Sequence, residues 1–80
     1  MRKAFKWNFD KHEYEEVEIS DDCCIFTENM QQIVECPNCG KKHKFGAGYA
    51  SRQYHNRYGF AYSVCEKCYD KELENVRKEL

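Results

Sequence analysis

Apolar and polar side chains alternate along the first third of the chain. Residues 5–9 read Phe-Lys-Trp-Asn-Phe, and this period of two predicts an edge or half-buried strand. Val17 and Ile19 alternate with glutamates and predict a second short strand, whereas the polar residues 11–16 are expected to form a loop. Four apolar residues at 23–26 follow turn-forming residues and predict a third strand. This part of the chain is therefore expected to be an antiparallel β element.

The pattern changes in the second half of the chain. Residues 41–45 predict one strand, and residues 49–64 predict a β-hairpin that turns at residues 55–57. From residue 65 onward, apolar side chains recur at helical spacing without an intervening Gly or Pro. The members of this stripe are Cys65, Tyr69, Leu73, Val76 and Leu80. We expect a C-terminal helix that packs through Tyr69, Leu73 and Val76 and exposes its opposite face.

Two cysteine pairs carry the clearest chemical signal. Cys36 and Cys39 form one C-x-x-C motif, and Cys65 and Cys68 form a second one. Four thiolates match the tetrahedral coordination of Zn²⁺ in structural sites, with no position left for a substrate. Gly40 permits a left-handed residue after the first pair, which closes a zinc knuckle. We expect one structural Zn²⁺ per chain, held by these four cysteines.

Composition supports a small fold that a metal stabilises. Eighty residues suffice for one domain, but a core of this size alone gives marginal stability. Leu, Ile, Val and Phe are few, yet the net charge is only −1, which argues against a disordered chain. We predict a single α+β domain, with residues 1–32 as an acidic β element and residues 33–80 as the zinc-binding part.

The cysteines also permit other interpretations. Disulfides need an oxidising compartment, but the N-terminus lacks the apolar segment of a secretion signal and no stretch reaches transmembrane length. We therefore expect a reducing, cytoplasmic location and no membrane contact. Cys36 and Cys39 could form a redox dithiol, although such a dithiol does not need a second pair.

Four further residues could contribute to the site. Neighbouring strand residues point to opposite faces, so one of Cys23 and Cys24 is expected in the core and the other partly exposed. A vicinal disulfide or a replacement ligand is the alternative for them. His43 and His55 could replace a cysteine ligand, but four thiolates already satisfy the ion, so a solvated basic surface is the preferred interpretation of them.

The order of these motifs resembles a known family. A C-P-x-C-G knuckle, a β-hairpin and a C-x-x-C at a helix start are similar to the treble-clef zinc-finger family over residues 33–80. The resemblance implies the ligands Cys36, Cys39, Cys65 and Cys68. In a rubredoxin-like or zinc-ribbon site a Gly typically follows each pair, but Tyr69 follows the second pair here. The whole chain also resembles small uncharacterised zinc-finger proteins of bacteria and their phages.

Charge is segregated along the chain. Residues 1–35 carry nine acidic and four basic side chains, whereas residues 36–64 carry five basic and no acidic ones. Lysines next to the ligands would offset the negative charge of a four-thiolate zinc site, but Arg52 and Arg57 are distant from all four cysteines in sequence. The basic side chains that we expect to contact a partner are Lys41, Lys44, Arg52 and Arg57.

These features favour a non-enzymatic, zinc-stabilised adaptor that binds another macromolecule, preferably a protein. The alternative is a nucleic-acid-binding zinc finger, in which the basic residues 41–57 hold phosphates and the interleaved aromatic rings stack on bases. A net charge of −1 and a pI near 6.3 argue against a free-standing nucleic-acid binder. A thiol redox protein is the third interpretation. No catalytic motif and no small-molecule substrate site is evident in the sequence.

Overall fold

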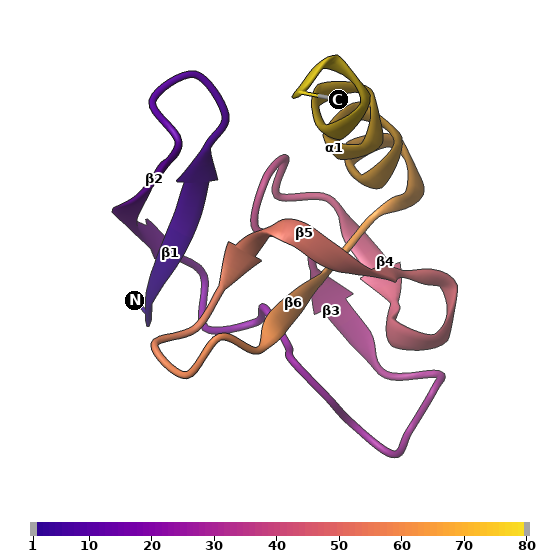
Figure 1. Cartoon of the computed structure of the whole chain (residues 1–80). Helices are drawn as coiled ribbons and strands as arrows, with labels where there is room; N and C mark the ends of the chain where they lie inside the picture. Colours follow the sequence, from indigo (N-terminus) through magenta and orange to yellow (C-terminus); the bar gives the residue numbers. More distant parts are fainter. Residues whose placement is uncertain (1, 80) are drawn as a thin grey trace.

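The computed structural model describes residues 2–79, which form two antiparallel sheets and one helix (Figure 1). The larger sheet has the strand order β2-β1-β5-β6, with β1 (Arg2–Asn8), β2 (Glu13–Ile19), β5 (Tyr49–His55) and β6 (Ala61–Val64). The smaller sheet pairs β3 (Ile33–Glu35) with β4 (Lys42–Lys44). A short 3-10 helix, η1 (Phe45–Ala47), precedes β5, and α1 (Glu66–Glu79) follows β6. The predicted α+β class is confirmed.

The N-terminal hairpin agrees with its prediction in part. The half-buried alternative for the first strand is confirmed, since β1 lies between β2 and β5 and its residues 5–8 are half-buried. The prediction of a loop at residues 11–16 is wrong for residues 13–16, because β2 begins at Glu13. β2 is an edge strand, so its glutamates reach solvent while its backbone pairs with β1. One of them, Glu16, pairs with Lys3 across the ladder at 2.8 Å.

The predicted third strand at residues 23–26 is also wrong. These residues form an irregular segment in which the Cys24 carbonyl accepts one hydrogen bond from the Ser63 N–H at 2.9 Å. The apolar side chains divide between the core and the surface without forming a ladder: Cys23 is 2% exposed and Phe26 is 70% exposed. Cys23 is thus a core residue and Cys24 is half-buried, which confirms the prediction for this pair.

The core consists of two neighbouring clusters. The first lies against one face of the larger sheet and contains Ala4, Ile19, Cys23, Tyr54 and Tyr62. The second joins the end of β6 to the cysteine pairs and contains Cys36, Val64 and Cys68. The cysteine pairs therefore contribute directly to the packed interior of this small fold.

The helix α1 packs against β5, and Tyr69 stacks on Tyr49 with ring centroids 4.8 Å apart. The predicted stripe of Tyr69, Leu73 and Val76 is only half-buried, and Leu80 lies outside the described residues. The most deeply buried side chains of α1 are instead Cys68 and Glu72. A buried carboxylate is tolerated here because Glu72 accepts hydrogen bonds from the Ser51 hydroxyl and the Arg52 backbone N–H.

Candidate metal centre

The first cysteine pair lies in a tight turn between β3 and β4. The Cys36 N–H donates to the Lys41 carbonyl and the Gly40 N–H donates to the Cys36 carbonyl, both at 2.9 Å. Gly40 has φ +76°, so the left-handed residue expected after the pair is present. The short β3–β4 ladder continues directly from these hydrogen bonds, with Glu35 opposite Lys42. The turn therefore holds Cys36 and Cys39 as a rigid pair.

The second pair lies where β6 passes into α1. Val64 ends β6 and is fully buried, and Cys65 follows it immediately before the first residue of the helix. The Tyr69 N–H donates to the Cys65 carbonyl at 3.0 Å, which closes the first helical turn. Cys68 lies in that turn, so both sulfurs of the pair can reach one point.

The four thiols gather at one place. The Sγ atoms of Cys36, Cys39, Cys65 and Cys68 all lie within 4.8 Å of one another. The Cys39 and Cys65 sulfurs are 3.7 Å apart. Tetrahedral coordination at about 2.3 Å per bond separates two sulfurs by about 3.8 Å, so the donors and their spacing fit one metal ion. All six cysteines are free thiols.

The protein environment shifts the pKa values of Cys36, Cys65 and Cys68 in different directions. Burial raises the pKa of Cys36, while hydrogen bonds from the backbone of Cys39, Cys65 and Asn38 partly oppose that shift. Burial also raises the pKa of Cys68. At Cys65 the effect of burial is outweighed by hydrogen bonds from the backbone and thiol of Cys68 and from neighbouring thiols, so its pKa is lowered. A cation bound among the sulfurs would favour the thiolate at all four positions.

The centre is buried on one side and open on the other. Cys36 and Cys68 are buried, Cys65 is half-buried and Cys39 is exposed. The Tyr54 hydroxyl donates to the Asn38 side-chain carbonyl at 3.1 Å, which ties the knuckle to β5. Both sheets and the helix therefore meet at the cysteine cluster.

The lysines beside the knuckle have different surroundings. The Lys42 ammonium lies 2.7 Å from an Asp22 carboxylate oxygen and 3.3 Å from a Glu35 carboxylate oxygen. Lys42 thus pairs with two acidic side chains from residues 1–35. The charge pattern of the sequence did not specify this contact. Lys41 and Lys44 are exposed.

The four basic residues expected to contact a partner lie on separate elements. Lys41 and Lys44 belong to the smaller sheet and its turn, whereas Arg52 lies in β5 and Arg57 lies in the β5–β6 turn. The Arg57 guanidinium lies 5.9 Å from the centre of the Tyr58 ring. These side chains are therefore divided between the two sheets.

Neither histidine belongs to the cysteine cluster that the described residues form. The His43 Nε2 lies 2.9 Å from the Ser63 hydroxyl, and the His55 Nδ1 lies 3.5 Å from the Tyr14 hydroxyl. Both histidines are half-buried, so the expectation of a solvated basic surface is wrong for them. The sequence gives no direct sign of these contacts, since each joins residues at least 20 positions apart.

Comparison with known proteins adds no relative. No protein-family model matches this chain, and no curated protein or solved structure matches it significantly. Among the described residues, no helix is both long enough and apolar enough to cross a membrane.

Proposed function

We propose that this chain is a zinc-stabilised, non-enzymatic binding module of the treble-clef type whose partner is another protein. The observation that carries the proposal is the cluster of four thiols within 4.8 Å. Zn²⁺ is the ion that commonly binds four cysteines in an intracellular protein. A knuckle hairpin (β3–β4), a second hairpin (β5–β6) and a helix follow one another around the cluster, which is the order of a treble clef.

A structural role for the metal is favoured over catalysis. Four protein thiolates complete a tetrahedral shell, whereas catalytic zinc sites keep a position for water or substrate. The cluster also argues against a simple redox dithiol at Cys36 and Cys39, since the sulfurs of the second pair lie within 4.8 Å of theirs.

A protein partner is favoured by a group of neighbouring apolar side chains, here called the apolar patch. Its members are the exposed Phe26, Met30 and Ile33 and the half-buried Phe45. Phe26 is 70%, Ile33 56% and Met30 45% exposed. The Phe26 and Phe45 rings meet edge to face, with centroids 6.2 Å apart. Contiguous exposed apolar groups on a small domain are typical of protein-binding surfaces.

One lysine borders the apolar patch. Lys44 lies directly opposite Ile33 in the β3–β4 ladder and is exposed. An apolar centre with a cation at its edge suits a partner that presents apolar side chains beside an acidic one. The position of Lys44, one of the four basic residues singled out in the sequence, supports its proposed role as a contact residue.

The metal is tested by native mass spectrometry. We expect one zinc ion per chain, which a strong chelator removes. The double variant Cys36→Ser, Cys39→Ser should bind no zinc, whereas Cys23→Ser should keep the full stoichiometry because Cys23 lies in the other core cluster. Full zinc occupancy in the double variant would contradict the assignment.

The partner is tested by affinity capture from nuclease-treated cell extract, so that nucleic acid cannot bridge two proteins. The variant Phe26→Ala, Ile33→Ala should lose the proteins that the wild type captures specifically. Phe60→Ala is the matched control, because this exposed aromatic residue lies in the β5–β6 turn outside the apolar patch. Equal capture by wild type and double variant would argue against this surface.

A further inference from the structure

The face of the larger sheet opposite the first core cluster carries a group of aromatic side chains. Ala4 and Tyr54 point to the core, and the alternating residues Phe5 and Trp7 point to the other face of β1. Tyr14 lies opposite Trp7 in the β1–β2 ladder, and His55 lies opposite Phe5 in the β1–β5 ladder. Three strands therefore contribute to one aromatic surface, and Tyr14 remains 52% exposed.

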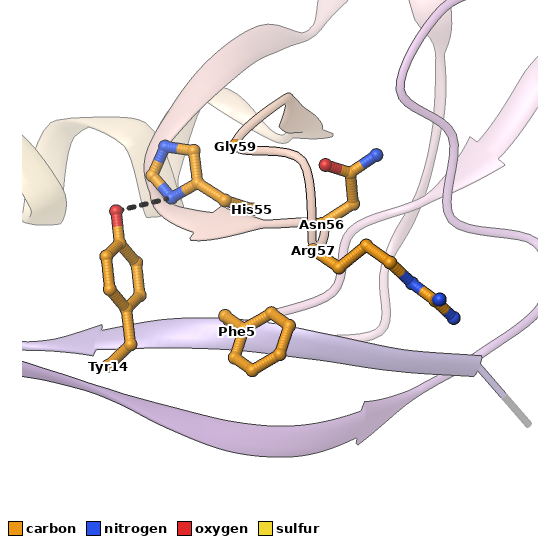
Figure 2. Close-up of a pocket in the computed structure, with 6 residues that line it drawn as sticks. All are labelled: Phe5, Tyr14, His55, Asn56, Arg57 and Gly59. Atoms are coloured by element: carbon orange, nitrogen blue, oxygen red, sulfur yellow. Dashed lines mark hydrogen bonds between the residues drawn. The ribbon is translucent and has the colours of Figure 1, made fainter.

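This surface contains a cavity of about 360 Å³, here called the aromatic pocket. Its lining residues are Phe5, Tyr14, His55, Asn56, Arg57 and Gly59. In Figure 2, Phe5 lies between the Tyr14–His55 pair and Arg57. The Tyr14 and His55 rings are nearly perpendicular, at 89°, with centroids 5.7 Å apart. The pocket thus offers flat apolar walls at one end and a cation at the other.

The charges around the aromatic pocket favour an anion. None of its lining residues is acidic. Burial lowers the pKa of His55, so the formal positive charge of the pocket comes from Arg57. A second recess of about 360 Å³ shares Phe5, Asn56 and Arg57 with the pocket and adds the cations Arg2 and Lys3.

We propose that this face binds single-stranded nucleic acid, with one unpaired base in the aromatic pocket and its phosphate at Arg57. The neighbouring recess with Arg2 and Lys3 receives the next phosphate. Aromatic rings stack on any unpaired base, and a basic groove follows the backbone of a single strand. The site is distinct from the apolar patch, and the inference does not rest on the proposed protein partner.

Other ligand classes fit less well. A cationic ligand, which aromatic cages bind, would be repelled by Arg57 and would find no carboxylate among the residues that line the pocket. A peptide with an aromatic side chain needs an acid at one particular position to meet Arg57. A nucleic acid carries one phosphate per nucleotide, which matches Arg57 in the pocket and Arg2 in the neighbouring recess, where Glu16 pairs with Lys3.

The acidic side chains of the chain limit the strength of binding. Glu16 also lines the second recess, where it pairs with Lys3 at 2.8 Å. The Arg2 guanidinium donates to the Cys23 carbonyl at 3.0 Å. Glu16 neutralises Lys3, whereas the uncharged Cys23 carbonyl leaves the charge of Arg2 available, so Arg57 and Arg2 are the main cations for phosphate. We expect a dissociation constant between about 1 and 100 µM at physiological salt.

Trp7 makes the site observable, because it is the single tryptophan of the chain and its ring centroid lies 5.0 Å from that of Tyr14. The experiment titrates the zinc-loaded full chain with a single-stranded oligothymidylate of about eight nucleotides. Binding is measured by anisotropy of labelled oligonucleotide and by Trp7 emission. We expect saturable quenching of Trp7, weaker binding of a duplex of equal length, and a log–log salt slope of about −1.4.

Variants locate the site. Tyr14→Ala should weaken binding about tenfold, whereas Tyr14→Phe should keep it because the stacking ring remains. Arg57→Gln should weaken binding and reduce the magnitude of the salt slope by about 0.7. Phe26→Ala, an exposed aromatic residue of the apolar patch, is the matched control and should bind like the wild type.

Three results would each overturn the proposal. The first is no binding of the oligonucleotide by either measurement at about 50 mM salt. The second is equal binding by Tyr14→Ala, Arg57→Gln and the wild type. The third is binding of an acidic, aromatic peptide to the pocket with no binding of the oligonucleotide. Tyr14 and Arg57 are exposed, so we expect their replacement to leave the fold intact, and a circular dichroism spectrum checks this for each variant.

Discussion

Glu72 is a buried acidic residue, and both of its carboxylate oxygens accept hydrogen bonds. The Ser51 hydroxyl donates to one Glu72 carboxylate oxygen at 2.7 Å, and the Arg52 N–H donates to the other at 2.6 Å. The Ser51 oxygen in turn accepts the N–H groups of Gln53 and Tyr54 at 2.9 and 2.8 Å. Both carboxylate oxygens of Glu72 and the Ser51 hydroxyl therefore have hydrogen-bond partners, and these bonds connect α1 to β5.

The titration of Glu72 should make stability depend on pH. Burial raises the pKa of Glu72 above 4.5, although hydrogen bonds from Ser51 and Arg52 partly oppose the shift. The folded state therefore binds this proton more readily than the unfolded state. The resulting stabilisation is complete below the unfolded pKa and is lost as pH rises through the raised folded pKa. The free energy of unfolding of wild type minus that of Glu72→Gln should therefore fall as pH rises above about 4.3.

Urea unfolding of both proteins with excess zinc, at several pH values from about 4 to 8, measures this difference. Protonation of the cysteine ligands affects both proteins alike and cancels in the subtraction. A difference that stays flat or increases with pH would show that Glu72 does not have a raised pKa in the folded state.

Gly40 provides a second prediction at the residue scale. Its φ of +76° is unfavourable for other residues, whereas a Cβ atom there would meet nothing within 4 Å. Gly40→Ala should therefore destabilise the zinc-loaded protein by about 1–2 kcal/mol through backbone strain alone. Gly40→Asn should cost less, because Asn tolerates the left-handed region. Equal stability of all three proteins in denaturant unfolding would contradict this account of the knuckle.

At the scale of elements, α1 depends on polar contacts as much as on its apolar stripe. Cys68 and Glu72, one turn apart, are its most buried side chains, while the stripe of Tyr69, Leu73 and Val76 is half-buried. The helix lies along β5, which is itself held by β1 and β6. The packing of α1 thus links the cysteine cluster to the larger sheet.

The exposure of Leu73 sets the size of its contribution. Leu73→Ala should reduce the free energy of unfolding by about 1–2 kcal/mol, less than the 2–5 kcal/mol typical of a fully buried leucine. The neighbouring surface variant Glu74→Ala should change it by about 0.5 kcal/mol or less. Thermal or urea unfolding of both variants checks the comparison. A silent Leu73→Ala that lowers self-association would instead identify the stripe as a contact between copies.

At the scale of the whole molecule, the cysteine cluster connects the two sheets. The knuckle joins β3 to β4, the Tyr54–Asn38 hydrogen bond joins it to β5, and β5 pairs with β1. The second core cluster is made largely of the proposed zinc ligands. Loss of the metal should therefore affect the first core cluster as well.

Chelation should unfold the whole described chain. Zinc binding contributes on the order of 10–16 kcal/mol in small zinc domains, which exceeds the free energy of unfolding expected for a domain of this size. After metal removal, hydrogen exchange should become fast in β1 and β2 as well as in β5, β6 and α1. Re-addition of zinc should restore protection. Persistent protection of the β1–β2 hairpin would show that residues 1–32 form an independently stable element.

Local chemistry let the sequence alone predict the cysteine pairs, the Gly40 turn, the β5–β6 hairpin and the helix. Each of these depends on residues within a few positions: the C-x-x-C spacing, the φ of one glycine, or the helical spacing of apolar side chains. Such short-range constraints act before any tertiary contact forms, so their pattern is visible in the sequence.

Only the tertiary structure decided features that depend on a distant partner. Residues 13–16 are polar, yet they belong to β2 because their backbone pairs with β1. Residues 23–26 are apolar, yet they form no strand because no strand pairs with them in a ladder. Glu72 is buried because Ser51 and Arg52, about 20 positions away, hydrogen-bond its carboxylate. The aromatic pocket likewise joins β1, β2 and β5. Strand pairing and burial are set by non-local contacts, which the identity of the neighbouring residues does not specify.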